Sequence, residues 1–149
     1  MIRVDYTLMC DDVRQENNGK LMLIGVYTPN IAITQLPYTA QSLAFFQHLE
    51  IERLGMYTLR FQLSNLETGT PLASAMMMMD IQQALVLPGT GINVVRFGSV
   101  RFDRAGAYHL NTVVDGQNEV FTHTFDVILN IPQIPQGPGQ LMPGQFPGR

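Results

Sequence analysis

Few side chains in this sequence could do chemistry, and one short segment holds three of them. His48, Glu50 and Glu52 occupy alternating positions. On a β-strand they would share one face, with about 7 Å between successive side chains. Imidazole and carboxylate groups at this spacing could act as acid and base in a hydrolase, or bind a metal ion. The ordinary alternative is a charged outer face of a strand, and the spacing alone fits both.

A second group of polar side chains lies between residues 11 and 19. Asp11, Asp12, Glu16 and Asn17 offer carboxylate and amide oxygens, which are the ligands that Ca²⁺ takes in proteins. The segment ends in the turn signal Asn-Asn-Gly, so we predict a polar loop. Its spacing does not match an EF-hand, and acidic turns are commonly only solvated. Calcium binding by this loop is therefore an alternative and not the main prediction.

The motifs of the common enzyme classes are missing from the sequence. It has no Gly-x-Ser-x-Gly, no P-loop, no His-Glu-x-x-His and no paired Cys-x-x-Cys. Cys10 is the single cysteine, which rules out an internal disulfide bond. It falls on the apolar side of its segment without a partner nearby in the sequence, so we do not expect a nucleophile. We predict that the protein is not an enzyme and needs no cofactor or metal.

These side chains must be positioned by β-strands, and the clearest signal is a hairpin over residues 106–129. Asp115-Gly116 between two alternating runs is a strong turn signal. The apolar faces of the two arms coincide only if the turn centres on Gly116-Gln117. This register pairs Tyr108 with Phe125, Leu110 with His123 and Thr112 with Phe121. His109 then faces solvent and His123 faces the core, where we expect a hydrogen-bond partner and not a metal ion.

Alternating apolar runs separated by turn signals recur along the first 130 residues and predict about eight strands. We expect them at 3–10, 20–27, 31–33, 43–51, 57–63, 72–80 and 92–102, followed by the two arms of the hairpin. A bulge or bend is expected at Gly98-Ser99, and a loop at 81–91. The pattern indicates an all-β protein, an antiparallel β-sandwich of immunoglobulin-like or similar Greek-key type.

Two of the predicted strands carry definite expectations about burial. In 3–10 the apolar, core-facing side chains are those of Val4, Tyr6, Leu8 and Cys10. Segment 20–27 is almost continuously apolar, which is typical of a strand covered on both faces.

Four consecutive methionines, Met76, Met77, Met78 and Met79, fall in one predicted strand, so two point to each face. Methionine is flexible and polarizable, which suits a surface that adapts to a partner. The commoner alternative is a strand that is buried on both faces. The four methionines are therefore a candidate interface, with core packing as the alternative.

Composition narrows the classes of function. The 149 residues are enough for one domain with its own core. Charged residues make up 14% of the chain, well below the usual quarter, and a surface this poor in charge is often covered by a partner. A net charge of −3 with a single lysine argues against nucleic-acid and anionic-membrane partners. The start of the chain lacks the apolar core of a signal peptide, so we expect a cytoplasmic protein or a virion component.

Residues 131–149 differ in composition from the rest of the chain. They hold five of the nine prolines and no charge before Arg149. We therefore divide the chain into a β-sandwich domain, 1–130, and an extended arm, 131–149. The separated apolar residues of the arm, which we expect to anchor it to a protein partner, are Ile134, Leu141, Met142 and Phe146. The alternative is a disordered tail without a docking role.

Three short segments near the start carry a resemblance to a known family. They are Cys10-Asp11-Asp12, Asn18-Gly19-Lys20 and Leu23-Ile24-Gly25-Val26-Tyr27. Together they resemble the opening of a family of small bacterial and phage proteins, a domain of unknown function. The resemblance covers mainly the first third of the chain. It implies a compact β domain and supplies no activity, cofactor or catalytic residue.

These observations favour a non-enzymatic structural or assembly protein. Its sandwich body and arm would bind a larger protein lattice, most concretely as a phage virion component such as a capsid decoration protein. The expected partners are capsid or other virion proteins, or further copies of the chain. The alternative is a ligand-binding or calcium-binding sandwich that uses the loops at 11–19 and 81–91.

Overall fold

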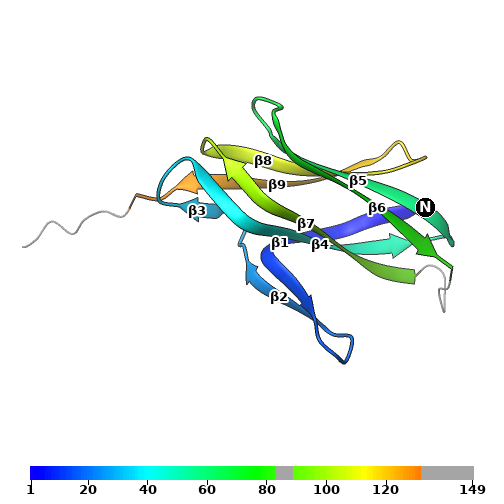
Figure 1. The fold of residues 1–149 in the computed structure, drawn as a ribbon. Coiled ribbons are helices and arrows are strands. Elements are labelled where there is room, and N and C mark those ends of the chain that lie inside the picture. Colours follow the sequence, from blue (N-terminus) through cyan, green and yellow to red (C-terminus); the bar gives the residue numbers. More distant parts are fainter. Residues whose placement is uncertain (83–88, 132–149) are drawn as a thin grey trace, which may run out of the picture.

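The computed structural model describes residues 1–82 and 89–131, and in these ranges the chain forms strands and no helix (Figure 1). The strands are β1 (Ile2–Gln15), β2 (Leu21–Val26), β3 (Ile31–Ile33), β4 (Tyr38–Ile51), β5 (Gly55–Asn65), β6 (Pro71–Ile81), β7 (Gly89–Phe102), β8 (Gly106–Val114) and β9 (Val120–Leu129). The fold is all-β, as the alternation of apolar residues predicts. This part of the chain holds no helix that is long and apolar enough to cross a membrane.

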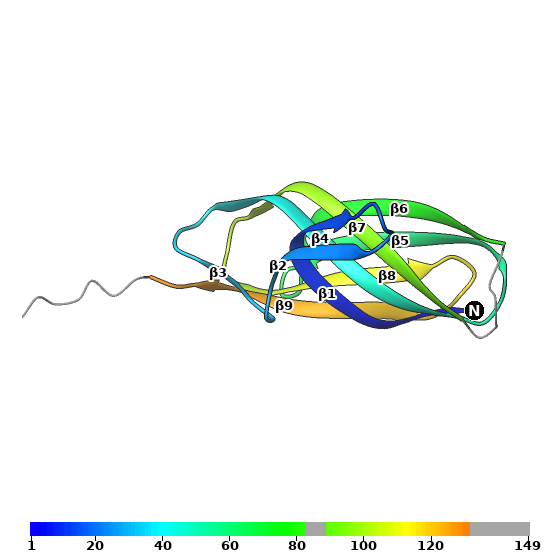
Figure 2. The ribbon, with the colours of Figure 1, turned by 90° about the horizontal axis from the view of Figure 1, so that it is seen from below.

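The strands form two sheets that pack face to face (Figure 1, Figure 2). One sheet has the order β2-β1-β4-β7 and the other the order β3-β9-β8-β5-β6. Their inner faces share one apolar core, in which the rings of Phe102 and Tyr108 meet edge-on with centres 5.0 Å apart. All strand pairs are antiparallel except β3 with β9. The short strand predicted at 31–33 therefore exists, but its pairing is parallel.

The hairpin of β8 and β9 has the predicted register. Tyr108 pairs with Phe125, Leu110 with His123 and Thr112 with Phe121. The rings of Tyr108 and Phe125 are both buried and stack with centres 6.0 Å apart. A slip of one residue in either arm would turn one of these rings toward solvent, so burial holds the register.

The first strand departs from its predicted pattern. A register shift between Val4 and Tyr6, in the pairing of β1 with β4, reverses the direction of the side chains that follow. Tyr6 and Leu8 are 46% and 39% exposed, although we expected both in the core. Met9, expected outside, is buried in the main core instead. The predicted inner face of this strand is therefore wrong beyond the bulge.

The far end of β1 and strand β2 form a hairpin at one edge of the four-stranded sheet. It projects below the other strands in Figure 1, and Figure 2, seen from below, shows it across the four-stranded sheet. A second, smaller apolar cluster joins this hairpin to that sheet; its buried residues are Cys10, Val13, Ala44 and Phe46. Met22 and Val26 of β2 are 47% and 44% exposed. The prediction that this segment is covered on both faces is wrong, because β2 is an edge strand.

A buried polar bridge joins the two sheets through the core. Gln47 of β4 donates from Nε2 to Thr112 Oγ1 of β8 at 2.8 Å. Asn93 of β7 donates from Nδ2 to Gln47 Oε1 at 3.1 Å. All three side chains are almost fully buried, where an amide without a partner would be costly. The bridge therefore favours one placement of the two sheets relative to each other.

The connection between β6 and β7 differs from the predicted loop at 81–91. Ile81 still belongs to β6, and Gly89 already belongs to β7. Residues 83–88 lie outside the described ranges. The bend predicted at Gly98-Ser99 is present, since Ser99 has a φ of 48°, a left-handed conformation that is uncommon for serine.

Candidate functional site

The three side chains that could form an acid–base cluster each have a separate partner. His48 Nδ1 lies 3.3 Å from Asp5 Oδ2, and Glu50 lies 3.9 Å from the guanidinium of Arg3. Glu52 follows the end of β4 and lies 4.0 Å from the N-terminal amino group. None of the three lines a hollow of the described surface. Their arrangement is that of a charged outer face.

The polar loop predicted at 11–19, for which calcium binding is the alternative, does not have the expected form. Asp11 and Asp12 belong to β1, which continues to Gln15. Asp12 accepts a hydrogen bond from Arg14 at 3.1 Å and lies 3.6 Å from Arg96. The Arg14 hydrogen bond is the main cause that lowers the pKa of Asp12. Within residues 1–82 and 89–131, no group of three or more His, Cys, Asp or Glu side chains could hold a metal ion.

Two of the segments that carry the family resemblance meet in space. The Tyr27 hydroxyl donates to Asp11 Oδ1, and Ser42 Oγ donates to the Asp11 carbonyl oxygen at 2.7 Å. Gly25 lies beside Asp11 with a φ of +64°, and a Cβ at this position would lie 2.1 Å from Asp11 Oδ2. Only glycine leaves room for the carboxylate. Burial, followed by the Asp11 carboxylate, raises the pKa of Tyr27 far above its ordinary value, so the hydroxyl remains a donor.

The histidines of the long hairpin lie on opposite faces, as predicted. His123 is half-buried, and its ring lies edge-on to Phe45 with centres 6.1 Å apart. In the described part of the chain its ring makes no hydrogen bond, so the expected partner is not found. Burial lowers the pKa of His123. The ring also lines a hollow of about 480 Å³ between β1 and β9.

Cys10 lies fully buried in the smaller apolar cluster. Burial, and then the carboxylates of Asp11 and Asp12, raises the pKa of its thiol. A buried thiol of this kind stays protonated near neutral pH and is a poor nucleophile.

The methionine segment lies on an edge strand and has two different faces. Met76 and Met78 are 67% and 65% exposed on the outer face of the five-stranded sheet. Met77 and Met79 are half-buried and pack against the main core. The alternative of a strand buried on both faces is wrong, because nothing in the described part of the chain covers the outer face of β6.

A groove of about 680 Å³ runs over the same outer face, beside Met76. Its apolar wall includes Val113 and Val120, and Val120 is 52% exposed. Arg60 and Asp115 form an ion pair at its rim, with Nη2 and Oδ2 2.9 Å apart. Gln62, Ser74 and Asn111 also line the groove, so it mixes apolar and polar side chains, as protein-binding surfaces commonly do.

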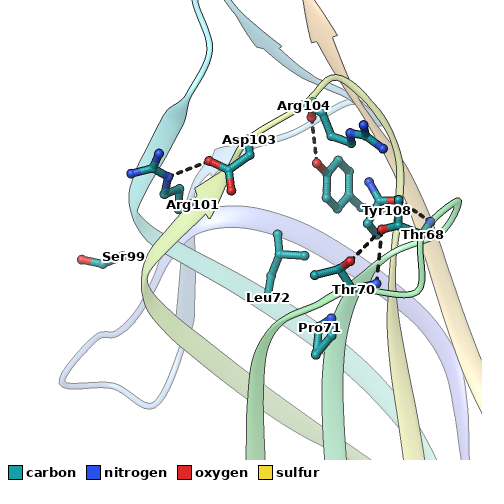
Figure 3. A pocket seen from close by; sticks show the side chains of 10 residues that line it. Thr68, Thr70, Pro71, Leu72, Ser99, Arg101, Asp103, Arg104 and Tyr108 are labelled. Atoms are coloured by element: carbon teal, nitrogen blue, oxygen red, sulfur yellow. Dashed lines mark hydrogen bonds and ion pairs between the residues drawn. The ribbon is translucent and has the colours of Figure 1, made fainter.

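A second hollow, of about 510 Å³, lies where the turn between β5 and β6 meets the connection between β7 and β8 (Figure 3). Arg101 Nε donates to Asp103 Oδ1 at 2.7 Å, and the Tyr108 hydroxyl donates to the Arg104 carbonyl oxygen at 2.7 Å. The sequence does not predict this site, because its wall comes from separate strands and turns. The one feature of the sequence that marks it is the short charged segment Arg101–Arg104 at the end of a predicted strand.

The arm anchors Ile134, Leu141, Met142 and Phe146 lie outside the described residues, so their docking role stays a prediction.

Comparison with known protein families identifies the family of this chain. The model of a family of unknown function, DUF6941, matches residues 5–128. The chain belongs to this family. The expectation of an uncharacterised domain is confirmed by DUF6941 membership, and the matched range includes the Asp11–Gly25 contact, the methionine face and the hollow of Figure 3. The arm follows the matched range and is not part of it.

One solved structure with some similarity to this DUF6941 chain is the crystal structure of the C-terminal domain of wzt. The two chains are 11% identical, the match covers 87% of this chain and 75% of that chain, and the TM-score is 0.45. No curated protein matches the chain.

Proposed function

We propose that this protein is a non-enzymatic assembly protein that binds another protein through the outer face of its five-stranded sheet. The observation that carries the proposal is the pair Met76 and Met78, which expose about two thirds of their surface on an edge strand. Exposed apolar side chains that cluster beside a groove are typical of protein-binding surfaces. Methionine adapts its shape to a partner at small cost.

The groove beside Met76 gives this surface the composition of an interface. Val113 and Val120 extend the apolar area, and the ion pair of Arg60 with Asp115 supplies a polar rim. Only 14% of the residues in the chain are charged, so a partner that covers part of the surface removes few charged side chains from water. The two sheets would then form a rigid platform, which we infer to be a sandwich of immunoglobulin-like or related Greek-key type.

The concrete form of the proposal is a phage virion component, such as a capsid decoration protein. The arm, 131–149, would contact a neighbouring subunit through Ile134, Leu141, Met142 and Phe146. Five prolines and four glycines make this segment unsuited to a helix, whereas an extended chain can lie along a neighbour and present separate apolar anchors. The partners would be capsid or other virion proteins, or further copies of the chain.

A photo-crosslinking residue at position 76 tests the proposed face. The control carries the same residue at position 41, an exposed position of β4 in the four-stranded sheet. Each protein is irradiated in an extract of the source cells or with particles from the source. We expect one abundant protein to crosslink at position 76 and not at 41. Equal crosslinking at both positions, or crosslinking at 41 alone, would contradict the proposal.

The arm is tested separately with a chain that ends at Asn130. We expect the truncated chain to fold and to capture the same partner more weakly than the whole chain. Equal capture by both chains would show that the body carries recognition and that the arm has no docking role.

A further inference from the structure

The hollow shown in Figure 3 is separate from the methionine face and has a different chemistry. We propose that it is a binding site for a small organic anion, held by its carboxylate or phosphate group. The inference goes beyond the proposed assembly function, since the site is built from other residues at one end of the two sheets.

The first observation is a buried amide with an unused donor. Asn65 ends β5, is 3% exposed and belongs to the wall of the hollow. Its Oδ1 accepts from the backbone N–H groups of Glu67 at 3.0 Å and Thr68 at 2.9 Å, which fixes the orientation of the amide. Its Nδ2 has no hydrogen-bond partner in the described part of the chain. A buried donor without an acceptor is unfavourable, and an anionic oxygen in the hollow would satisfy it.

The second observation is an arginine that has no carboxylate partner. Arg101 is paired with Asp103 at 2.7 Å, so these two charges compensate each other. Arg104 also lines the hollow, and among the described residues its guanidinium makes no ion pair. The side chains that line the hollow, two arginines and one aspartate, therefore carry a net positive charge. A guanidinium presents paired N–H groups that match carboxylate and phosphate oxygens.

The turn between β5 and β6 adds a hydroxyl donor to the wall. Thr68 Oγ1 donates to Thr70 Oγ1 at 2.9 Å, which leaves the Thr70 hydroxyl proton free to donate to a ligand. Ser99 of β7 also lines the hollow, in the left-handed conformation that turns the strand at this point, although its hydroxyl points away from the other labelled side chains in Figure 3. A serine in this conformation is uncommon and marks a position where the backbone is held in a specific shape.

The apolar part of the wall can pack against the carbon skeleton of an organic anion, in addition to the contacts that its anionic group makes. Figure 3 shows Leu72 between the pair Arg101–Asp103 on one side and Thr70 on the other. Pro71 and the ring of Tyr108 complete this part of the wall. The volume of about 510 Å³ lies within the range of small-molecule sites. Asp103 is the one carboxylate of the wall and is already paired, so a metal cation has little to bind here.

Chemical-shift perturbation of the backbone amides tests the site on the whole chain. The probes are succinate, its neutral isostere succinamide, and inorganic phosphate, each with sodium chloride as the ionic-strength control. We expect succinate or phosphate to shift the amides of Thr68, Thr70, Ser99 and Arg104, and succinamide to leave them in place. A response to only one of the two anions would identify the group that the site prefers.

Two variants and one control make the result specific. Arg104→Gln removes the net positive charge of the wall at an exposed position, and we expect binding to weaken roughly tenfold or more. Asn65→Asp keeps the acceptor for both backbone N–H groups but replaces the donor with a charge that repels anions. The control is Arg53→Gln, in the turn at the opposite end of β5. Equal shifts with succinate and succinamide, or unchanged binding in Arg104→Gln, would overturn the proposal.

Discussion

Replacing Gly25 with alanine tests the contact that joins the two segments of the family resemblance. Gly25 has a φ of +64°, and a Cβ would lie 2.1 Å from Asp11 Oδ2 and 2.8 Å from Asp11 Cγ. Alanine in a left-handed conformation costs about 1–2 kcal/mol. The carboxylate of Asp11 must also move, which breaks its hydrogen bond with Tyr27 and removes about 1 kcal/mol more. We expect Gly25→Ala to lower the free energy of unfolding by about 2–3 kcal/mol.

Gly19→Ala is the matched control. Gly19 also has a positive φ, +81°, but nothing lies within 4 Å of the position of its Cβ. Gly19→Ala should therefore lower the free energy of unfolding only through backbone strain. Alanine also reduces the conformational entropy of the unfolded chain, and this effect is the same in both variants. The difference between the two variants, about 1 kcal/mol, then measures the Asp11 contact. Urea unfolding followed by circular dichroism gives both values.

A double-mutant cycle with Asp11→Ala separates strain from contact. In the Asp11→Ala background the carboxylate is absent and only the Cβ of residue 11 remains near the new methyl group, at 3.2 Å, so the cost of Gly25→Ala should fall toward that of Gly19→Ala. Equal destabilisation by Gly25→Ala and Gly19→Ala in the parent chain would refute the reasoning, because the contact would then carry no energy.

Two further predictions concern stability. Met77→Ala should lower the free energy of unfolding by about 1–2 kcal/mol, because Met77 packs against the core. Met76→Ala, on the exposed face, should change it by less than about 0.5 kcal/mol. Equal effects of the two variants in urea unfolding would contradict the assignment of faces. Burial lowers the pKa of His123 in the folded state, so its stabilising contribution is present above the ordinary value of about 6.5 and is lost as the pH falls through the lowered pKa. His123→Leu should therefore reduce the loss of stability between about pH 7 and pH 5, and an unchanged slope would refute the cause given for the shift.

The β8–β9 hairpin could be predicted in detail because local signals agree there. Asp115-Gly116 specifies the turn, and burial of Tyr108 and Phe125 selects one register of the two arms. The same holds for β5, since Leu59, Phe61 and Leu63 alternate with polar residues and are all buried.

The inward residues of the first strand could not be predicted, because both of its faces are buried, each against a different cluster. Met9 packs in the main core, while the neighbouring Cys10 packs in the smaller cluster under the β1–β2 hairpin. Adjacent buried residues conflict with simple alternation, and the bulge after Val4 had already reversed the faces. Both features depend on how β2 and β4 pair with β1, which the sequence of β1 alone does not contain.

The candidate sites show the same limit. The exposure of Met76 and Met78 follows from the position of β6 at a sheet edge, which depends on the order of strands that are distant in sequence. The hollow of Figure 3 combines Asn65, Thr70, Ser99 and Arg104 from separate parts of the chain. Side chains of this kind are common on any surface, and only their convergence distinguishes them.

The most direct test of the proposed function is capture of a partner by a Met76→Glu/Met78→Glu variant. Thr39→Glu/Gln41→Glu is the matched control, because it places two charges at the same spacing on exposed positions of β4, in the four-stranded sheet. The two variants and the parent chain are immobilised separately, and each is challenged with extract or particles from the source. We predict that the methionine variant folds but loses the partner, whereas the control retains it. Capture of the same partner in the same amount by the methionine variant would contradict the account.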